Sequence, residues 1–163
     1  MGAAFAHALA RRDLNLVIIA GRKEILESTA KELFKRFLIE VWSVCCDLAA
    51  PYALDQIRST IGDETINFLD SKAALTHIGP FLDQPVSKHI RIAGVNMITI
   101  LNMLYHYRGQ MVDAGRGGIV LMSSLAGNQG SGFLATYAVT KAFSRIQAEG
   151  LWYEWKSKGV DVI

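Results

Sequence analysis

Short apolar runs alternate with longer segments of helical pattern along the whole chain, and this alternation limits the folds that the chain can adopt. Parallel strands need a crossover connection between them, which is usually a helix. The sequence therefore predicts an α/β layer fold with a mostly parallel sheet. The expected strands are residues 16–20, 39–46, 65–69, 118–122 and 160–163, and the expected helices are 2–12, 22–37, 51–61, 83–112 and a last helix that ends at 158.

Two of the expected helices carry further predictions. Gly94 and Gly109 are candidate interruptions of the long helix 83–112, because glycine weakens a helix interior. The apolar residues of the helix 22–37 recur at helical spacing, which predicts one buried face. That face comprises Leu26, Ala30, Leu33, Phe34 and Phe37.

The composition fits a single domain that spans residues 1–163. The hydrophobic fraction of 51% is enough for a real core, and no linker, repeat or low-complexity segment divides the chain. A formal net charge of +2 without a basic stripe disfavours nucleic acid and acidic membranes as partners. No apolar run approaches the length of a membrane span.

Cysteine and histidine give no sign of a metal or redox site. Cys45 and Cys46 are adjacent at the end of an apolar run and match no such spacing. His77 and His106 have no metal-ligand spacing with cysteines or acids, and we expect them in a loop and on a helix surface. We expect the two cysteines to be reduced core thiols of a cytoplasmic protein.

Tyr137 and Lys141 stand four residues apart in a segment of helical composition, so their side chains lie on one face and can meet. Lowering the pKa of a tyrosine to about 7 needs roughly 4 kcal/mol of preference for the phenolate. An ammonium about 4 Å away, at an effective dielectric constant of about 20, supplies an interaction of that order. Lys141 alone is therefore enough to make Tyr137 a usable proton donor.

Ser124 follows the apolar run 119–122 after one intervening serine, and lies thirteen residues before Tyr137. A hydroxyl at the C-terminal end of a strand, opposite a tyrosine on the next helix, is well placed to hold a carbonyl oxygen while the tyrosine protonates it. The sequence Gly-Ile-Val-Leu-Met-Ser-Ser, followed by Tyr-Ala-Val-Thr-Lys-Ala, resembles the active-site region of the short-chain dehydrogenase/reductase family. The alternative is an ordinary exposed helix pair next to a serine turn.

The resemblance covers essentially the whole chain and implies a Rossmann-like, doubly wound parallel sheet. It also implies that parts of the family pattern are missing. These are the first strand with its glycine-rich turn, of which only the last glycine remains as Gly2, and the strand region beyond 163. In the family the first strand lies between the strands expected at 16–20 and 65–69. We therefore expect an incomplete NADP-binding domain and a partial sequence.

The resemblance places Gly21 and Arg22 where the family senses the adenosine ribose. An acid there favours NAD, whereas a cation favours the phosphate of NADP. No acid lies between Val17 and Lys23, so NADP is the expected cofactor and NAD the less favoured one. The alternative is that Arg22 is only a surface cation.

Two further strand ends resemble cofactor contacts of the family. Asp47, with Leu48 after it, matches the aspartate that receives the adenine amino group, although Asp47 is also a normal N-terminal cap for the helix expected from Pro51. The family's Asn-Asn-Ala-Gly is replaced by Ser71-Lys72-Ala73-Ala74, which keeps Ala73 as a cofactor contact. Asp70 and Lys72 add charges at this strand end.

Asn96, on the long helix, resembles the family asparagine that holds a water in a proton relay to the lysine. Asn102 is a competitor on the same helix, but its sequence context matches the family less well. A buried asparagine can also simply satisfy a helix kink. We favour the relay role for Asn96.

Taken together, the resemblance implies an oxidoreductase that transfers hydride between NADP(H) and a carbonyl or secondary alcohol. Tyr137 would donate the proton, Lys141 would lower its pKa and hold the nicotinamide ribose, and Ser124 would orient the carbonyl. We expect a small apolar substrate of steroid or fatty type, and a homo-oligomer formed through the long helices. The aromatic residues Trp152, Tyr153 and Trp155 are expected in the helical core or near that interface. The alternative is a catalytically silent truncated homologue that acts, if at all, by oligomerisation.

Overall fold

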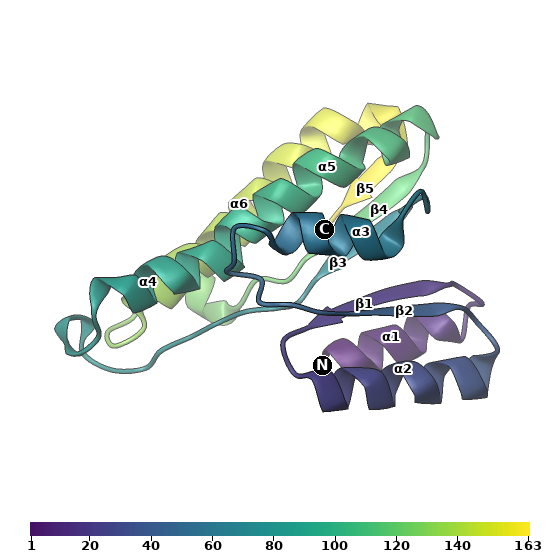
Figure 1. Ribbon diagram of the computed structural model, residues 1–163. Coiled ribbons are helices and arrows are strands. Elements are labelled where there is room, and N and C mark those ends of the chain that lie inside the picture. The colour runs from purple at the N-terminus through teal and green to yellow at the C-terminus, as the bar shows by residue number, and fades with distance from the viewer. The chain divides into compact units, whose positions relative to one another are not determined.

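The computed structural model describes all residues from Met1 to Ile163, and the chain divides into two compact units. Unit 1 is Met1–Glu64 and unit 2 is Thr65–Ile163 (Figure 1). Helices and parallel strands alternate in both, which confirms the predicted α/β fold.

Unit 1 contains α1 (Gly2–Ala10), β1 (Leu16–Ala20), α2 (Lys23–Phe37), β2 (Val41–Cys45) and α3 (Ala53–Ile61). Unit 2 contains β3 (Phe68–Ser71), α4 (Val86–Ala93), the π-helical segment η2 (Gly94–Ile98), α5 (Thr99–Asp113), β4 (Gly117–Leu121), α6 (Ala135–Trp155) and β5 (Val160–Val162), with short 3-10 turns η1 (Phe81–Asp83), η3 (Leu125–Gly127) and η4 (Lys156–Lys158).

Unit 1 is built on a two-stranded parallel sheet in which β1 pairs with β2 from Leu16 opposite Val41 to Ala20 opposite Cys45. Helices α1 and α2 lie side by side against this sheet (Figure 1). Their shared core consists of Ala6, Ala10, Leu16, Leu33 and Ile39. Because the strands are parallel, the residues that follow β1 and β2 leave the sheet at the same edge.

Unit 2 is built on a three-stranded parallel sheet in the order β3-β4-β5. Helices α5 and α6 run alongside each other and pack on one face of this sheet (Figure 1). Alternate strand residues, Ile119 with Leu121 and Val160 with Val162, point into the core beneath these helices, as the period of two requires. The helices contribute Ile100, Leu104, Met111, Ala148, Leu151 and Trp155.

The strand expected at 65–69 is displaced, since β3 runs from Phe68 to Ser71. Before it, the Ile66 backbone N–H donates to the side chain of Gln110 rather than to a strand. The paired segment ends in Asp70 and Ser71, whose polarity masks a strand in the sequence. The burial of Asp70 is made tolerable by an ion pair with Lys72.

The expected helices are confirmed with changes at their ends and in one interior. The helix 83–112 is interrupted at Gly94, where η2 begins, but not at Gly109. The helix 51–61 begins at Ala53, and α6 ends at Trp155 before η4. The predicted buried face of α2 was wrong at Phe34, which is exposed. Successive side chains of a helix point about 100° apart, so Phe34 points away from the direction of its buried neighbour Leu33.

The aromatic residues at the end of α6 divide between core and surface. Trp155 is buried in the core of unit 2, whereas Trp152 and Tyr153 are exposed. Cys45 and Cys46 are free thiols. None of the helices combines the length and the apolar character that crossing a membrane requires.

Candidate active site

Helix α6 presents Tyr137 and Lys141 on one face, as their spacing predicts. The Lys141 ammonium lies 5.8 Å from the centroid of the Tyr137 ring. The same Nζ donates a hydrogen bond of 2.8 Å to the carbonyl oxygen of Met122, the residue that follows β4. The two side chains therefore meet at the carboxyl end of the central strand of unit 2.

Lys141 is a buried cation, with only 3% of its surface exposed. Burial lowers the pKa of its ammonium below the usual lysine range, and the nearby positive charge of Lys72 lowers the pKa further. Neither effect removes the charge-assisted hydrogen bond to Met122. The result is an ammonium that can stabilise a neighbouring phenolate and is also closer to releasing its proton than a surface lysine.

Ser124 lies in the segment that follows β4, after Met122 and Ser123. Its Oγ accepts a hydrogen bond of 3.3 Å from the backbone N–H of Ala126 and caps the turn η3. Because the hydroxyl only accepts in this contact, its hydrogen remains available to donate to a carbonyl oxygen. The adjacent Ser123 has a different task, since its Oγ donates to the backbone carbonyl of Lys141 at 2.8 Å.

Gly127 lets the segment that carries Ser124 approach α6 closely. A Cβ at this position would lie 2.7 Å from the carbonyl carbon of Lys141 and 2.8 Å from the nitrogen of Ala142. Both atoms belong to the helix backbone, which cannot swing aside as a flexible side chain can. Gly127 is therefore a requirement for holding the Ser124 turn against the helix that carries Tyr137 and Lys141.

Asn96 is 1% exposed and lies inside the π-helical segment η2. Its Oδ1 accepts from the Leu75 backbone N–H, and its Nδ2 donates to the Leu75 carbonyl and to Thr140 Oγ1. Thr140 in turn donates to the carbonyl of Tyr137. The Asn96 side chain thus ties the loop after β3 to α6, whereas the competitor Asn102 is exposed.

In unit 1, the predicted cofactor residues follow the two parallel strands at one edge of their sheet. Gly21 and Arg22 come after β1, and Arg22 is exposed at the N-terminus of α2. Asp47 and Leu48 come after β2. Asp47 Oδ1 accepts from the backbone N–H of Ala49, so Asp47 forms a local turn.

The interpretation of Asp47 as a helix cap was wrong. The N-cap residue of α3 is Tyr52, and no side chain caps that helix. Of the remaining predicted cofactor residues, Ala73 is exposed shortly after β3, in unit 2. Gly2 is the first residue of α1, where neither its backbone conformation nor a close neighbour requires glycine.

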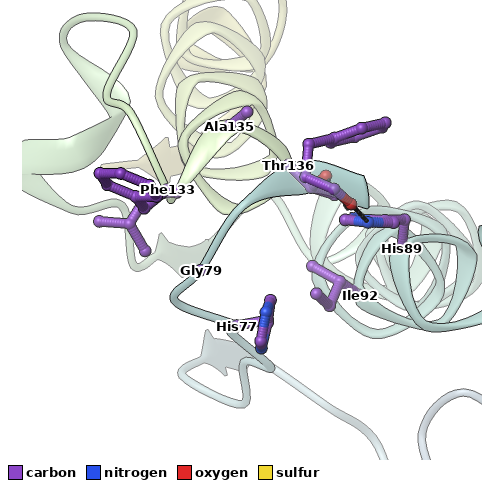
Figure 2. Close-up of a pocket in the computed structure, with 9 residues that line it drawn as sticks. His77, Gly79, His89, Ile92, Phe133, Ala135 and Thr136 are labelled. Carbon is purple, nitrogen blue, oxygen red and sulfur yellow. Dashed lines mark hydrogen bonds between the residues drawn. The ribbon is translucent and has the colours of Figure 1, made fainter. Parts of the chain in front are cut away.

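A small cavity lies beside the start of α6 (Figure 2). Its space of about 30 Å³ accommodates one or two waters or a single polar group. His89 bridges across it, with Nδ1 2.8 Å from Thr136 Oγ1 and Nε2 2.9 Å from the Phe81 carbonyl oxygen. Since that carbonyl can only accept, Nε2 carries the hydrogen. His77 also lines the cavity, and its Nε2 is buried without a hydrogen-bond partner.

Sequence reasoning missed three residues that position the site, namely Ser123, Gly127 and Thr140. All three residues lie next to the motif residues or between them. The sequence does not show their roles, because Ser123 and Gly127 act through contacts with the α6 backbone and Thr140 acts through Asn96. A glycine in the link between Ser124 and Tyr137 was the one usable signal.

Comparison with known proteins assigns the family. A family model described as short chain dehydrogenase matches residues 1–163. The chain belongs to the short-chain dehydrogenase family. The predicted recognition is therefore confirmed across the whole chain.

Individual members of the short-chain dehydrogenase family are similar at modest identity. A 7beta-hydroxysteroid dehydrogenase from Mediterraneibacter gnavus is 30% identical over 162 residues, which are 99% of this chain and 62% of that protein. A very-long-chain 3-oxoacyl-CoA reductase from Homo sapiens is 26% identical over 166 residues, 99% of this chain and 53% of that protein. The chain thus spans about half to two thirds of the length of these curated relatives.

Solved structures of short-chain dehydrogenases share the fold. A structure of a 7beta-hydroxysteroid dehydrogenase superposes with a TM-score of 0.93 at 28% identity, covering 98% of this chain and 61% of that one. A short-chain dehydrogenase from Sphingobium yanoikuyae in complex with NADPH superposes with a TM-score of 0.92 at 26% identity, covering 99% and 63%. These matches confirm a Rossmann-like α/β fold.

The contact of Gly127 with the α6 backbone makes a testable prediction. Replacing Gly127→Ala is expected to destabilise the protein by about 1–3 kcal/mol, because the added methyl group overlaps the helix backbone at Lys141. Urea unfolding measures the loss. Gly130→Ala is the matched control, since a Cβ at Gly130 meets no atom within 4 Å. Equal stability of the two variants would contradict the proposed close approach.

Proposed function

We propose that the chain is part of an NADP(H)-dependent oxidoreductase that interconverts a carbonyl group and a secondary alcohol. The observation that carries the proposal is the buried Lys141 ammonium beside the Tyr137 ring, at the strand end that also carries Ser124. A tyrosine hydroxyl next to a cation can give its proton to a carbonyl oxygen, and a serine hydroxyl supplies the hydrogen bond that a developing oxyanion needs.

In the proposed reaction, bound NADPH would supply a hydride to the carbonyl carbon of the substrate. Ser124 donates a hydrogen bond to the carbonyl oxygen, and Tyr137 gives that oxygen its proton. Lys141 stabilises the phenolate that is left behind. Asn96 acts as a positioning residue, because its side chain joins Leu75 to α6 through Thr140. The proton returns to Tyr137 from solvent through water near Asn96 and Lys141.

The residues present fit a dinucleotide that carries a 2′-phosphate. Arg22 and Lys23 are exposed where β1 leads into α2, at the position that contacts the adenosine ribose in this kind of fold. Asp47 follows the neighbouring strand at the same sheet edge and is a candidate acceptor for the adenine amino group. Gly2, Gly21 and Leu48 are the other proposed cofactor contacts of unit 1, and Ala73 is a proposed cofactor contact of unit 2.

The proposed substrate is an apolar ketone or alcohol of steroid or fatty acyl type. Support comes from the relatives, which include 7beta-hydroxysteroid dehydrogenases and very-long-chain 3-oxoacyl-CoA reductases. The cavity beside α6 is too small to hold such a molecule by itself. A steroid ketone and a 3-oxoacyl thioester are therefore the first compounds to test. We propose a cytoplasmic location for the enzyme.

The role of Tyr137 makes the central prediction. Tyr137→Phe is expected to lower the turnover of a ketone by about 10²–10⁴-fold, because the proton donor is lost. NADPH consumption measures turnover, and calorimetry is expected to show unchanged NADPH binding. Tyr52→Phe, at an exposed tyrosine just before α3, is the control. NADPH binding without turnover of any ketone by the parent chain would instead favour a catalytically silent homologue.

A second prediction concerns the choice of cofactor. Arg22→Ala is expected to weaken NADPH binding by about 10–100-fold, which is the effect of losing one charged hydrogen bond, and to leave NADH binding nearly unchanged. Calorimetry with both cofactors measures the difference. Arg36→Ala, at the far end of α2, is the control. Equal losses for NADPH and NADH would contradict a phosphate contact of Arg22.

We also propose that the enzyme is a homo-oligomer that associates through α5 and α6. The support is a stripe of exposed apolar residues on α6, at intervals of seven: Val139, Ile146 and Tyr153. On α5, Leu101 and Tyr105 are exposed four residues apart. Exposed apolar stripes at these spacings are typical of helices that pack against a partner.

The interface makes its own prediction. Ile146→Lys is expected to shift the protein toward monomer, because it places a charge in the middle of the apolar stripe. Sedimentation velocity measures the oligomeric state. Ile90→Lys, an equally exposed isoleucine on α4, is the control and is expected to change nothing. A monomeric parent chain, or dissociation by both variants, would contradict the proposal.

A further inference from the structure

The end of β3 carries a buried ion pair beside the proposed active site. Asp70 Oδ1 lies 3.3 Å from Lys72 Nζ, and their side chains are only 14% and 9% exposed. Burial raises the pKa of the Asp70 carboxyl, and Lys72 partly offsets this effect. Removing two charges from water is costly, so such a pair calls for an explanation beyond stability.

The strand register brings this pair next to Lys141. Ser71 lies opposite Leu121, and the Met122 backbone N–H donates to the Ser71 carbonyl at 3.1 Å. The next residues, Lys72 after β3 and Met122 after β4, therefore leave the sheet together. The Met122 carbonyl oxygen is the atom that holds Lys141 Nζ. Two buried ammonium groups are thus gathered at the ends of two paired strands.

Lys72 is the charged neighbour that acts on Lys141 from another element. On its own helix, Lys141 faces Tyr137. The β4 end and η3 contribute only neutral groups, the Met122 carbonyl and the Ser123 hydroxyl. From α4, which packs against α6, His89 contacts the helix at Thr136. The Lys72 charge lowers the pKa of Lys141, in addition to the effect of burial.

We propose that Lys72, held by Asp70, is a positioning residue that acts on Lys141 across the β3 and β4 strand ends and sets the pH range in which the active site keeps its positive charge. This rests on the proposed role of Lys141 in proton transfer. With Lys72 in place, Lys141 loses its proton at a lower pH, so the upper pH limit of turnover moves toward neutrality. Asp70 holds Lys72 and limits the effect of its charge.

The test reads Lys141 directly and does not require turnover. The Nζ of Lys141 is titrated by NMR in the full 163-residue chain with labelled lysine, and its signal is assigned with Lys141→Arg. Lys72→Met is expected to raise the apparent pKa of Lys141, because a repelling charge is removed. Lys72→Arg keeps the charge and is expected to keep the pKa low. Lys88→Met, which removes an exposed lysine on α4, is the control.

Asp70→Asn separates an electrostatic effect from loosening of the strand end. It removes an attracting charge and is expected to leave the apparent pKa of Lys141 unchanged or lower. A disrupted strand end would admit water to Lys141 and raise its pKa in Lys72→Met and Asp70→Asn alike, which would overturn the proposal. No change in Lys72→Met would overturn it too.

The double variant Asp70→Asn/Lys72→Met removes both charges of the pair and serves if Lys72→Met alone does not fold. It is expected to raise the apparent pKa of Lys141 by less than Lys72→Met would, because the attracting charge of Asp70 is lost as well. In a preparation that turns over a ketone, the basic limb of the pH profile is expected to move to higher pH with Lys72→Met. If the parent chain turns over no ketone, this would contradict the proposed function but would not change the NMR result. The two proposals therefore fail separately.

Discussion

The hydrogen bond from the Lys141 ammonium to the Met122 carbonyl oxygen joins the last long helix to the end of the central strand of unit 2. A buried cation needs such a partner, since an unpaired charge away from water is expensive. The contact is possible only because α6 comes very close to β4 and η3, which Gly127 permits and Ser123 reinforces. The position of Tyr137 on the same helix face follows from this docking.

Both units place their chemistry where parallel strands end, although they do so with different groups. After β1 and β2, unit 1 presents a cation and an acid, Arg22 and Asp47, at a partly exposed edge suited to a nucleotide. After β3 and β4, unit 2 presents buried groups instead, the Asp70–Lys72 pair and the Lys141 ammonium. Exposed groups can bind a charged cofactor at little desolvation cost, whereas buried ones act strongly on each other and on a bound carbonyl.

The sequence predicted the alternation of elements, the parallel strands and the pairing of Tyr137 with Lys141, because each follows from local periodicity or spacing. It failed where long-range contacts decide the outcome. The end of β3 was misplaced because an aspartate such as Asp70 is typical of a loop, and the sequence alone does not show its ion pair with Lys72. Phe34 was wrongly assigned to the core, because the apolar stripe of a helix does not show which of its residues contact the rest of the protein. Gly94 indicated an interruption of the long helix, but no pattern in the sequence showed that the interrupting segment, which carries Asn96, is π-helical.

The buried lysine also links stability to pH, and its contribution to stability rises with pH. Because the pKa of Lys141 is lowered in the folded protein, the unfolded chain binds more protons than the folded one between the folded pKa and the usual lysine value. The contribution of Lys141 to folding is therefore unfavourable at neutral pH, and becomes less so as the pH rises through that window. A neutral side chain of similar length would avoid this cost, but would lose the positive charge on which the proposed proton transfer from Tyr137 depends. The Met122 carbonyl oxygen offsets part of this cost, because it accepts a hydrogen bond from the buried ammonium.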